Sequence, residues 1–277
     1  MNEKKDKDLH NLSGVLNDVE EINSKLRKSL YRLCFDYQNK ISGTLNDDGI
    51  SRIYDSLSHR SQSLFFNLEL MFLEQEWAQI SLNDYKRNKN EPLRETYIMN
   101  NSSLRQFSHF DNLIFNAISL FDYSACAIEY ICGGKKRIKK NWNSIVKAAQ
   151  HSENELSKFK IANLVIEINK EWLDKLYEFR SNVIHYKTVS GGAVLTNNFT
   201  IGGHKLKLYA PFEFVKEFKN LKKIDEGYNI TLYYASAWLV KKAIIDTTKI
   251  INNLIDHMET HREIPEDEQP IQIVKGK

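Results

Sequence analysis

The side chains with the clearest chemical potential lie close together in the segment Phe179-Arg-Ser-Asn-Val-Ile-His-Tyr186. Arg180 carries a permanent charge that can bind two phosphate oxygens at once, and the imidazole of His185 can accept or donate a proton near neutral pH. If the segment is helical, Ser181 and Asn182 lie four and three residues before His185 and are its neighbours on the helix surface. This combination of guanidinium, imidazole, hydroxyl and carboxamide suits phosphodiester chemistry.

The spacing Arg180-Ser-Asn-Val-Ile-His185 resembles the Arg-x4-His motif of the HEPN superfamily of α-helical bundles. Ser181 provides the polar residue that usually follows the arginine. Several toxin members carry a tyrosine two positions after the histidine, whereas here Tyr186 follows directly and Lys187 takes the expected place. The apolar segment 110–123 resembles the long partner helix of such bundles.

The resemblance implies a ribonuclease that works without metal and cleaves RNA by attack of the ribose 2′-hydroxyl. Arg180 and His185 would be its catalytic residues, with Ser181, Asn182 and Tyr186 in supporting positions. The site would form where the helix of residues 154–186 meets its copy in a homodimer. A role in defence or in a toxin–antitoxin pair is implied by the family alone.

A short basic segment is the candidate RNA contact, although the net charge of +3 does not by itself point to nucleic acid. Its cations could bind phosphates and the tryptophan that follows could stack on a base. The alternative is a plain solvated loop. The residues are Lys135, Lys136, Arg137, Lys139, Lys140 and Trp142.

Other interpretations of the motif stay open. The chain contains a second, looser match, Arg52 with six residues before His59, in which the apolar Ile53 follows the arginine. Arg180 and His185 could also be cations that simply complement the negative end of a helix dipole. The chain would then be a non-catalytic helical module that binds a nucleotide, RNA or a protein, or a purely structural helical protein.

Several classes of function lack their sequence signatures. There is no P-loop, dinucleotide fingerprint, zinc-protease motif or EF-hand, so we expect no cofactor and no metal. The three cysteines form no CxxC pair and are expected to be reduced thiols. No apolar run is long enough for a membrane span and no secretory signal is visible, so the sequence predicts a cytoplasmic protein.

Apolar residues recur every three or four positions over much of the chain, which is the pattern of amphipathic helices. The segment 85–101 is polar and contains Pro92, so we expect a surface connection there. Between residues 189 and 210, apolar residues alternate with Gly and Asn pairs, which indicates a β-hairpin. The predicted helices cover residues 12–37, 49–82, 104–132, 143–150, 154–186 and 230–262.

The expected fold is therefore mainly all-α, a bundle of long antiparallel helices with a small β-hairpin insertion. With only 4 Pro and 11 Gly in 277 residues, few positions interrupt long helices. We expect an N-terminal helical region at residues 1–100 that packs on an HEPN-like bundle at residues 101–277.

Overall fold

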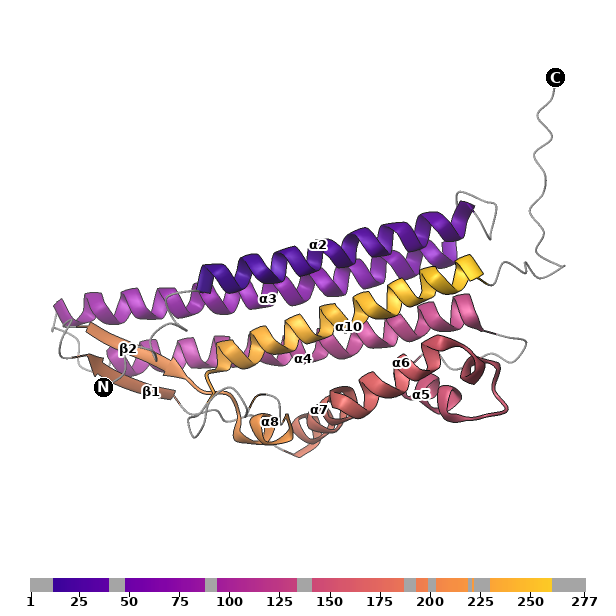
Figure 1. Cartoon of the computed structure of the whole chain (residues 1–277). Helices are drawn as coiled ribbons and strands as arrows, with labels where there is room; N and C mark the ends of the chain where they lie inside the picture. The colour runs from indigo at the N-terminus through magenta and orange to yellow at the C-terminus, as the bar shows by residue number, and fades with distance from the viewer. Residues whose placement is uncertain are drawn as a thin grey trace, which may run out of the picture. The chain divides into compact units, whose positions relative to one another are not determined.

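The computed structural model describes residues 12–39, 48–87, 94–133, 141–186, 193–198, 203–218, 221 and 230–260. The chain is mainly α-helical, which confirms the predicted fold class (Figure 1). The long helices are α2 (Leu12–Tyr37), α3 (Asp48–Arg87), α4 (Arg94–Cys132) and α10 (Leu232–Thr260). The shorter helices are α5 (Trp142–Gln150), α6 (Lys160–Ile168), α7 (Asp174–Tyr186) and α8 (Phe212–Glu217).

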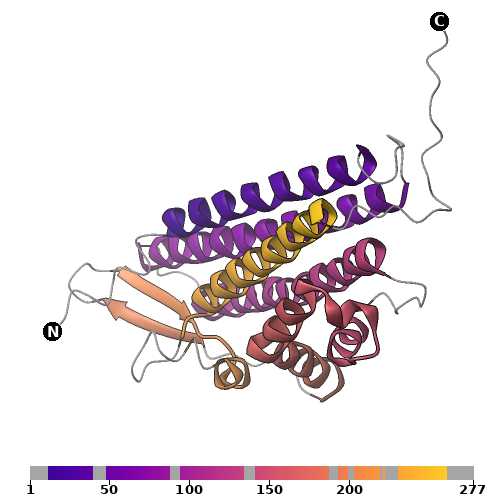
Figure 2. The same ribbon diagram turned by 45° about the vertical axis from the view of Figure 1, so that its right-hand side comes forward.

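Two short strands, β1 (Ala193–Asn198) and β2 (Gly203–Leu208), pair antiparallel with Leu195 opposite Leu206. The strands lie beside α3 in both views (Figures 1 and 2). Gln75 of α3 donates to the Leu206 carbonyl at 2.7 Å, and the side-chain oxygen of Gln79 accepts from the Leu206 amide at 3.3 Å. These two glutamines therefore bind both the backbone donor and the backbone acceptor of Leu206 and connect β2 to α3.

Two compact units divide the chain, and each contains segments of α2, α3, α4 and α10. Unit 1 comprises residues 1–21, 63–117 and 172–242, and unit 2 comprises residues 22–62, 118–171 and 243–277. Each unit combines segments from both sides of residue 100. The division into domains at that residue therefore does not coincide with a unit boundary, and it stays a prediction.

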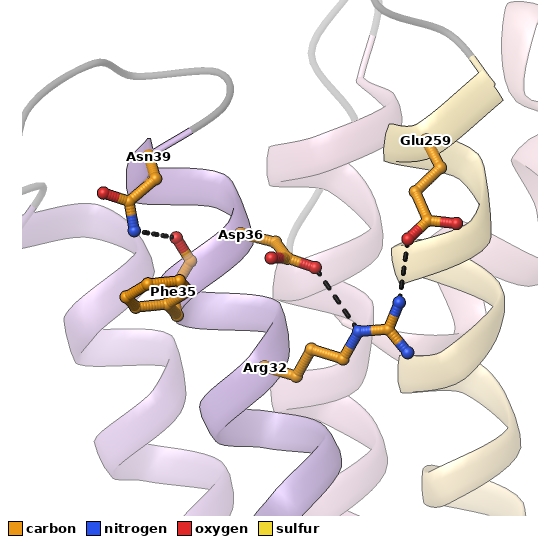
Figure 3. A network of polar contacts seen from close by, with 5 residues as sticks. All are labelled: Arg32, Phe35, Asp36, Asn39 and Glu259. Atoms are coloured by element: carbon orange, nitrogen blue, oxygen red, sulfur yellow. Dashed lines mark hydrogen bonds and ion pairs between the residues drawn. The ribbon is translucent and has the colours of Figure 1, made fainter.

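Unit 2 has buried leucines and isoleucines at its centre and polar bridges at its surface. Arg32 of α2 donates to Glu259 of α10 at 2.8 Å and lies 3.4 Å from Asp36, one turn further along α2 (Figure 3). Near the end of α2, Asn39 donates its side-chain amide to the Phe35 carbonyl, which satisfies one of the free carbonyls at a helix end.

Two of the predicted element boundaries are wrong. α4 begins at Arg94, so residues 94–101 are helical and not part of a polar connection. The segment 154–186 is not one helix, because a 3₁₀ turn at Glu155–Lys158 and a π-helical turn at Asn169–Leu173 flank α6 and separate it from α7. The apolar period continues through these turns, and the sequence pattern alone therefore did not reveal them.

Candidate phosphodiester site on α7

α7 carries the candidate motif in its last turns. Its backbone is helical through His185 and Tyr186, so position 185 follows Ser181 by about one turn of the helix. Ser181 and Asn182 are exposed. The side chains of His185 and Tyr186 lie outside the described part of the structure.

An aromatic cluster fixes the inner face of α7 within unit 1. Phe179 is buried, and its ring lies 5.2 Å from that of Phe214 in an edge-on arrangement. Phe214 in turn contacts Phe110 of α4 edge-on at 5.0 Å. Edge-to-face contacts of this kind add to the free energy of burial. Successive residues of a helix are rotated by about 100° around its axis. With Phe179 buried, Arg180 therefore lies at the border between the buried and the exposed side of α7.

Arg180 lies over an aromatic ring of α4. Its guanidinium carbon is 5.4 Å from the centroid of Phe115, a cation–π distance that contributes about 0.5–1 kcal/mol at an exposed site. The Arg180 side chain is half-buried, and Phe115 is 43% exposed. The ring holds the Arg180 side chain in place, and no carboxylate among the described residues pairs with it.

Phe115 is a residue of the candidate site that the sequence analysis did not predict. It lies out of phase with the core positions of α4, since Phe110, Leu113, Ile114 and Ala117 are buried. An aromatic residue on the exposed side of a strongly amphipathic helix was the available signal. The sequence could not show which residue of another helix would cover it.

The basic segment of residues 135–140 lies outside the described residues. The structure describes its neighbours: α4 ends at Cys132, and α5 begins at Trp142 after an Asn141 cap that accepts from the Ser144 amide. An RNA contact through this segment stays a prediction.

Trp142 is not a candidate for base stacking. Its side chain is fully buried, packs edge-on against Phe121 at 5.1 Å, and donates its indole N–H to Asn169 at 2.9 Å. A ring enclosed on all sides cannot stack on a base. The expected role of Trp142 in RNA binding is therefore corrected to a role in the core of unit 2.

The second motif match, Arg52 and His59, lacks a contact like that between Arg180 and Phe115 among the described residues. Arg52 and His59 are both exposed on the first turns of α3. They lie seven residues apart, which is two helical turns, and among the described residues no aromatic ring lies beneath the Arg52 guanidinium. The site hypothesis therefore remains with Arg180 and His185.

Two titratable groups near α3 and α4 have shifted pKa values. Burial lowers the pKa of His109, although the charge of Glu74 acts in the opposite direction. The ring nitrogen Nδ1 of His109 lies 3.2 Å from the side-chain oxygen of Asn67. Burial raises the pKa of Asp111. Both groups are in unit 1, on the helix that carries Phe115.

The described part of the chain offers neither a metal-binding cluster nor a membrane-spanning helix. Among the described residues, no group of three or more His, Cys, Asp or Glu side chains could hold a metal ion. Of the helices within the described ranges, none combines the length and the apolar composition that a transmembrane span requires.

No family model, curated protein or solved structure matches this chain. The likeness to the HEPN motif thus depends on the residues of α7 and on the helical fold.

Proposed function

We propose that the protein is a metal-independent endoribonuclease of HEPN type, with its site around Arg180 and His185. The observation that carries the proposal is the state of Arg180. This guanidinium is half-buried over Phe115 with no described carboxylate partner, and exposed Ser181 and Asn182 follow it on the same helix. A fixed cation with no carboxylate partner among the described residues, beside exposed hydrogen-bonding groups, is suited to a phosphate.

In the proposed reaction, His185 accepts the proton of a ribose 2′-hydroxyl as the 2′-oxygen bonds to phosphorus. The bond from phosphorus to the 5′-oxygen then breaks, and that oxygen takes up a proton from an imidazolium. The products are a 2′,3′-cyclic phosphate and a 5′-hydroxyl. Arg180 stabilises the extra negative charge of the pentacoordinate intermediate, the kind of electrostatic stabilisation that often dominates catalysis. Ser181, Asn182 and Tyr186 support this arrangement.

A homodimer completes the proposed site. Arg180 and His185 are five residues apart and therefore differ by about 140° around an ideal helix, which separates the two groups within one chain. A second α7 across a two-fold axis would supply the missing group to each site. The proposal includes the segment 154–186 as this interface, the basic segment of residues 135–140 as the RNA contact, and a cytoplasmic role in defence or as the toxin of a toxin–antitoxin pair.

A non-catalytic phosphate-binding module is the second candidate, because the fixed charge of Arg180 would bind RNA or a nucleotide whether or not the protein cleaves it. The test uses single-stranded RNA and a matched oligonucleotide without 2′-hydroxyls, both in excess EDTA. We expect cleavage of the RNA alone and a 2′,3′-cyclic phosphate on the product. Binding of both oligonucleotides without cleavage would favour the module, and cleavage of both would exclude the proposed mechanism.

A further inference from the structure

α3 is apolar on two opposite faces. Its core face is buried at Leu68, Met71, Ala78 and Leu82. A second apolar stripe recurs with alternating steps of four and three residues, and most of it is exposed: 56% at Phe66, 50% at Leu73, 42% at Trp77 and 61% at Ile80. Leu70, which completes the stripe, is half-buried.

α4 runs beside this part of α3 within unit 1. Arg105 of α4 donates to Glu74 at 3.1 Å, and its guanidinium lies 5.7 Å from the ring centroid of Trp77. Leu104 is 71% exposed and Tyr97 is 66% exposed. Both residues are on the side of α4 opposite to the buried positions Ser102 and Gln106.

The exposed stripe of α3 and the two exposed residues of α4 together form what we call the α3/α4 outer face. Its residues are Phe66, Leu70, Leu73, Trp77, Ile80, Tyr97 and Leu104. Exposed apolar residues scattered singly need no explanation, but a contiguous exposed set indicates an interaction surface. Steps of three and four residues are the spacing at which one helix packs its side chains into another. The stripe on α3 extends for about 21 Å at the usual helical rise, or about four turns.

Acidic side chains border this face. Glu69 and Glu76 flank the stripe on α3, and Asp111 lies one turn before Phe115 on α4. Within the described part of the chain, these three carboxylates make no ion pair, whereas Arg105 is already paired with Glu74. On the α3 side of the face, the charges left for an occupant are therefore negative, whereas the Arg180 guanidinium lies over Phe115, beyond Asp111.

We propose that the α3/α4 outer face binds a basic amphipathic α-helix of a protein partner. The apolar stripe of that helix would cover the exposed side chains, and Lys or Arg residues on its flanks would face Glu69, Glu76 and Asp111. Two copies of this face packed on each other would bring acidic borders together, and Glu69 and Glu76 along α3 repel the phosphates of a nucleic acid. A basic helix of a protein partner is attracted by these carboxylates and avoids both kinds of repulsion.

This docking site is independent of the proposed ribonuclease activity, although it extends toward the same region. Continuing the stripe on α4 by steps of four and three residues from Leu104 leads through Asp111 to Phe115, the ring beneath Arg180. A helix on this face would therefore lie along the approach to the candidate site.

The test uses a fluorescent designed peptide of about three heptads, with Leu at its core positions and Lys at the flanking positions, and a matched peptide with Glu at the flanks. Like charges on the flanks also keep each peptide from pairing with itself. From fluorescence anisotropy we expect the Lys peptide to bind at least about tenfold more tightly than the Glu peptide, because its charges complement those of the face.

Leu73→Asp should weaken binding of the Lys peptide by about tenfold or more, since it places a charge in the centre of the contact. Phe35→Asp, at a similarly exposed site on α2, is the matched control and should bind normally. Circular dichroism would verify that both variants fold. Equal affinity for the two peptides, or no binding, would overturn the proposal. A wild-type dimer that Leu73→Asp dissociates, or RNA binding lost in the same variant, would equally exclude the proposed occupant.

Discussion

At the scale of single residues, Phe115 and Arg180 determine what the candidate site can do. A guanidinium in water is mobile and well hydrated, whereas one held over a ring is oriented before it meets a phosphate. The ring and the cation come from different helices, so their contact is a consequence of tertiary structure. This pre-organisation can be tested without touching either motif residue.

Phe115→Ala removes the ring and should leave Arg180 charged but less ordered. We expect RNA to bind about two- to fivefold more weakly, the size of an exposed cation–π contact. The free energy of unfolding should change little, because the ring is 43% exposed. Fluorescence anisotropy and thermal denaturation measure the two effects. Phe35→Ala, which removes a ring that is 52% exposed on α2, serves as the control, and an equal loss of RNA affinity in it would contradict the assignment.

His109 should make the folded state sensitive to acid. Burial lowers its pKa, so the folded protein binds this proton less readily than the unfolded chain does. Stability from this group is therefore present above the unfolded pKa of about 6.5 and is lost as the pH falls through and below that value. His109→Gln should reduce the fall in Tm between about pH 7.5 and pH 5.5. The control, His59→Gln at an exposed position, should show the same fall in Tm as the wild type. Identical pH profiles of Tm for the two variants would count against this account.

At the scale of helices, periodicity predicted where the long helices lie but not how they are interrupted. The buried positions of α10, such as Val240, Ile244 and Ile251, follow the expected stripe. The break between α6 and α7 has no composition signal, since Asn169–Leu173 contains neither Gly nor Pro. A π-helical turn is selected by what surrounds it, and here Trp172 packs edge-on against Trp238 at 6.1 Å.

The candidate site was predictable from sequence only in part. The spacing of Arg180 and His185 could be read directly, because both residues lie on one element. The contact between Phe115 and Arg180 could not be predicted, because it joins residues 65 positions apart in the sequence. The error at Trp142 has a similar origin: a tryptophan after a run of lysines looks exposed in the sequence, whereas Asn169 and Phe121 enclose it.

The contact between α5 and the turn after α6 should be important for stability. Asn169 accepts the indole N–H of Trp142 at 2.9 Å, and Trp142 is fully buried. Asn169→Ala leaves this donor without a partner, at a cost of about 1–3 kcal/mol in the free energy of unfolding. Asn163→Ala, on the exposed side of α6, is the matched control and should cost less than about 0.5 kcal/mol. Chemical denaturation of the two variants compares them, and equal losses would show that the bond contributes nothing.

At the scale of the whole molecule, charge is distributed unevenly along the chain. The cations of residues 135–140 follow the end of α4 in the sequence, whereas Glu69, Glu76 and Asp111 at the α3/α4 outer face pair with no cation in the described part of the chain. A single net charge of +3 hides this contrast. The basic segment and the α3/α4 outer face are therefore expected to bind partners of opposite charge.

Replacing Lys135, Lys136, Lys139 and Lys140 with Ser should weaken RNA binding with little regard to sequence. Each lost phosphate contact should reduce the slope of log K against log salt by about 0.7 for single-stranded RNA. Titrations at several salt concentrations measure this slope. Replacement of the exposed cations Lys25, Arg27 and Lys28 of α2 is the control, and an unchanged slope in the first variant would reassign the segment to plain solvation.

The central claim is that Arg180 and His185 form a ribonuclease site, and the most direct measurement compares RNA cleavage by four variants in the presence of EDTA. We expect His185→Ala to lose about 10²–10⁴-fold in rate, as is typical when a general acid or base is removed. Arg180→Ala should lose about 10²-fold or more, because it removes the charge that stabilises the intermediate. Arg52→Ala and His59→Ala, from the looser match on α3, should cleave at the wild-type rate. Full activity of a folded His185→Ala protein, or equal losses in all four variants, would contradict the account.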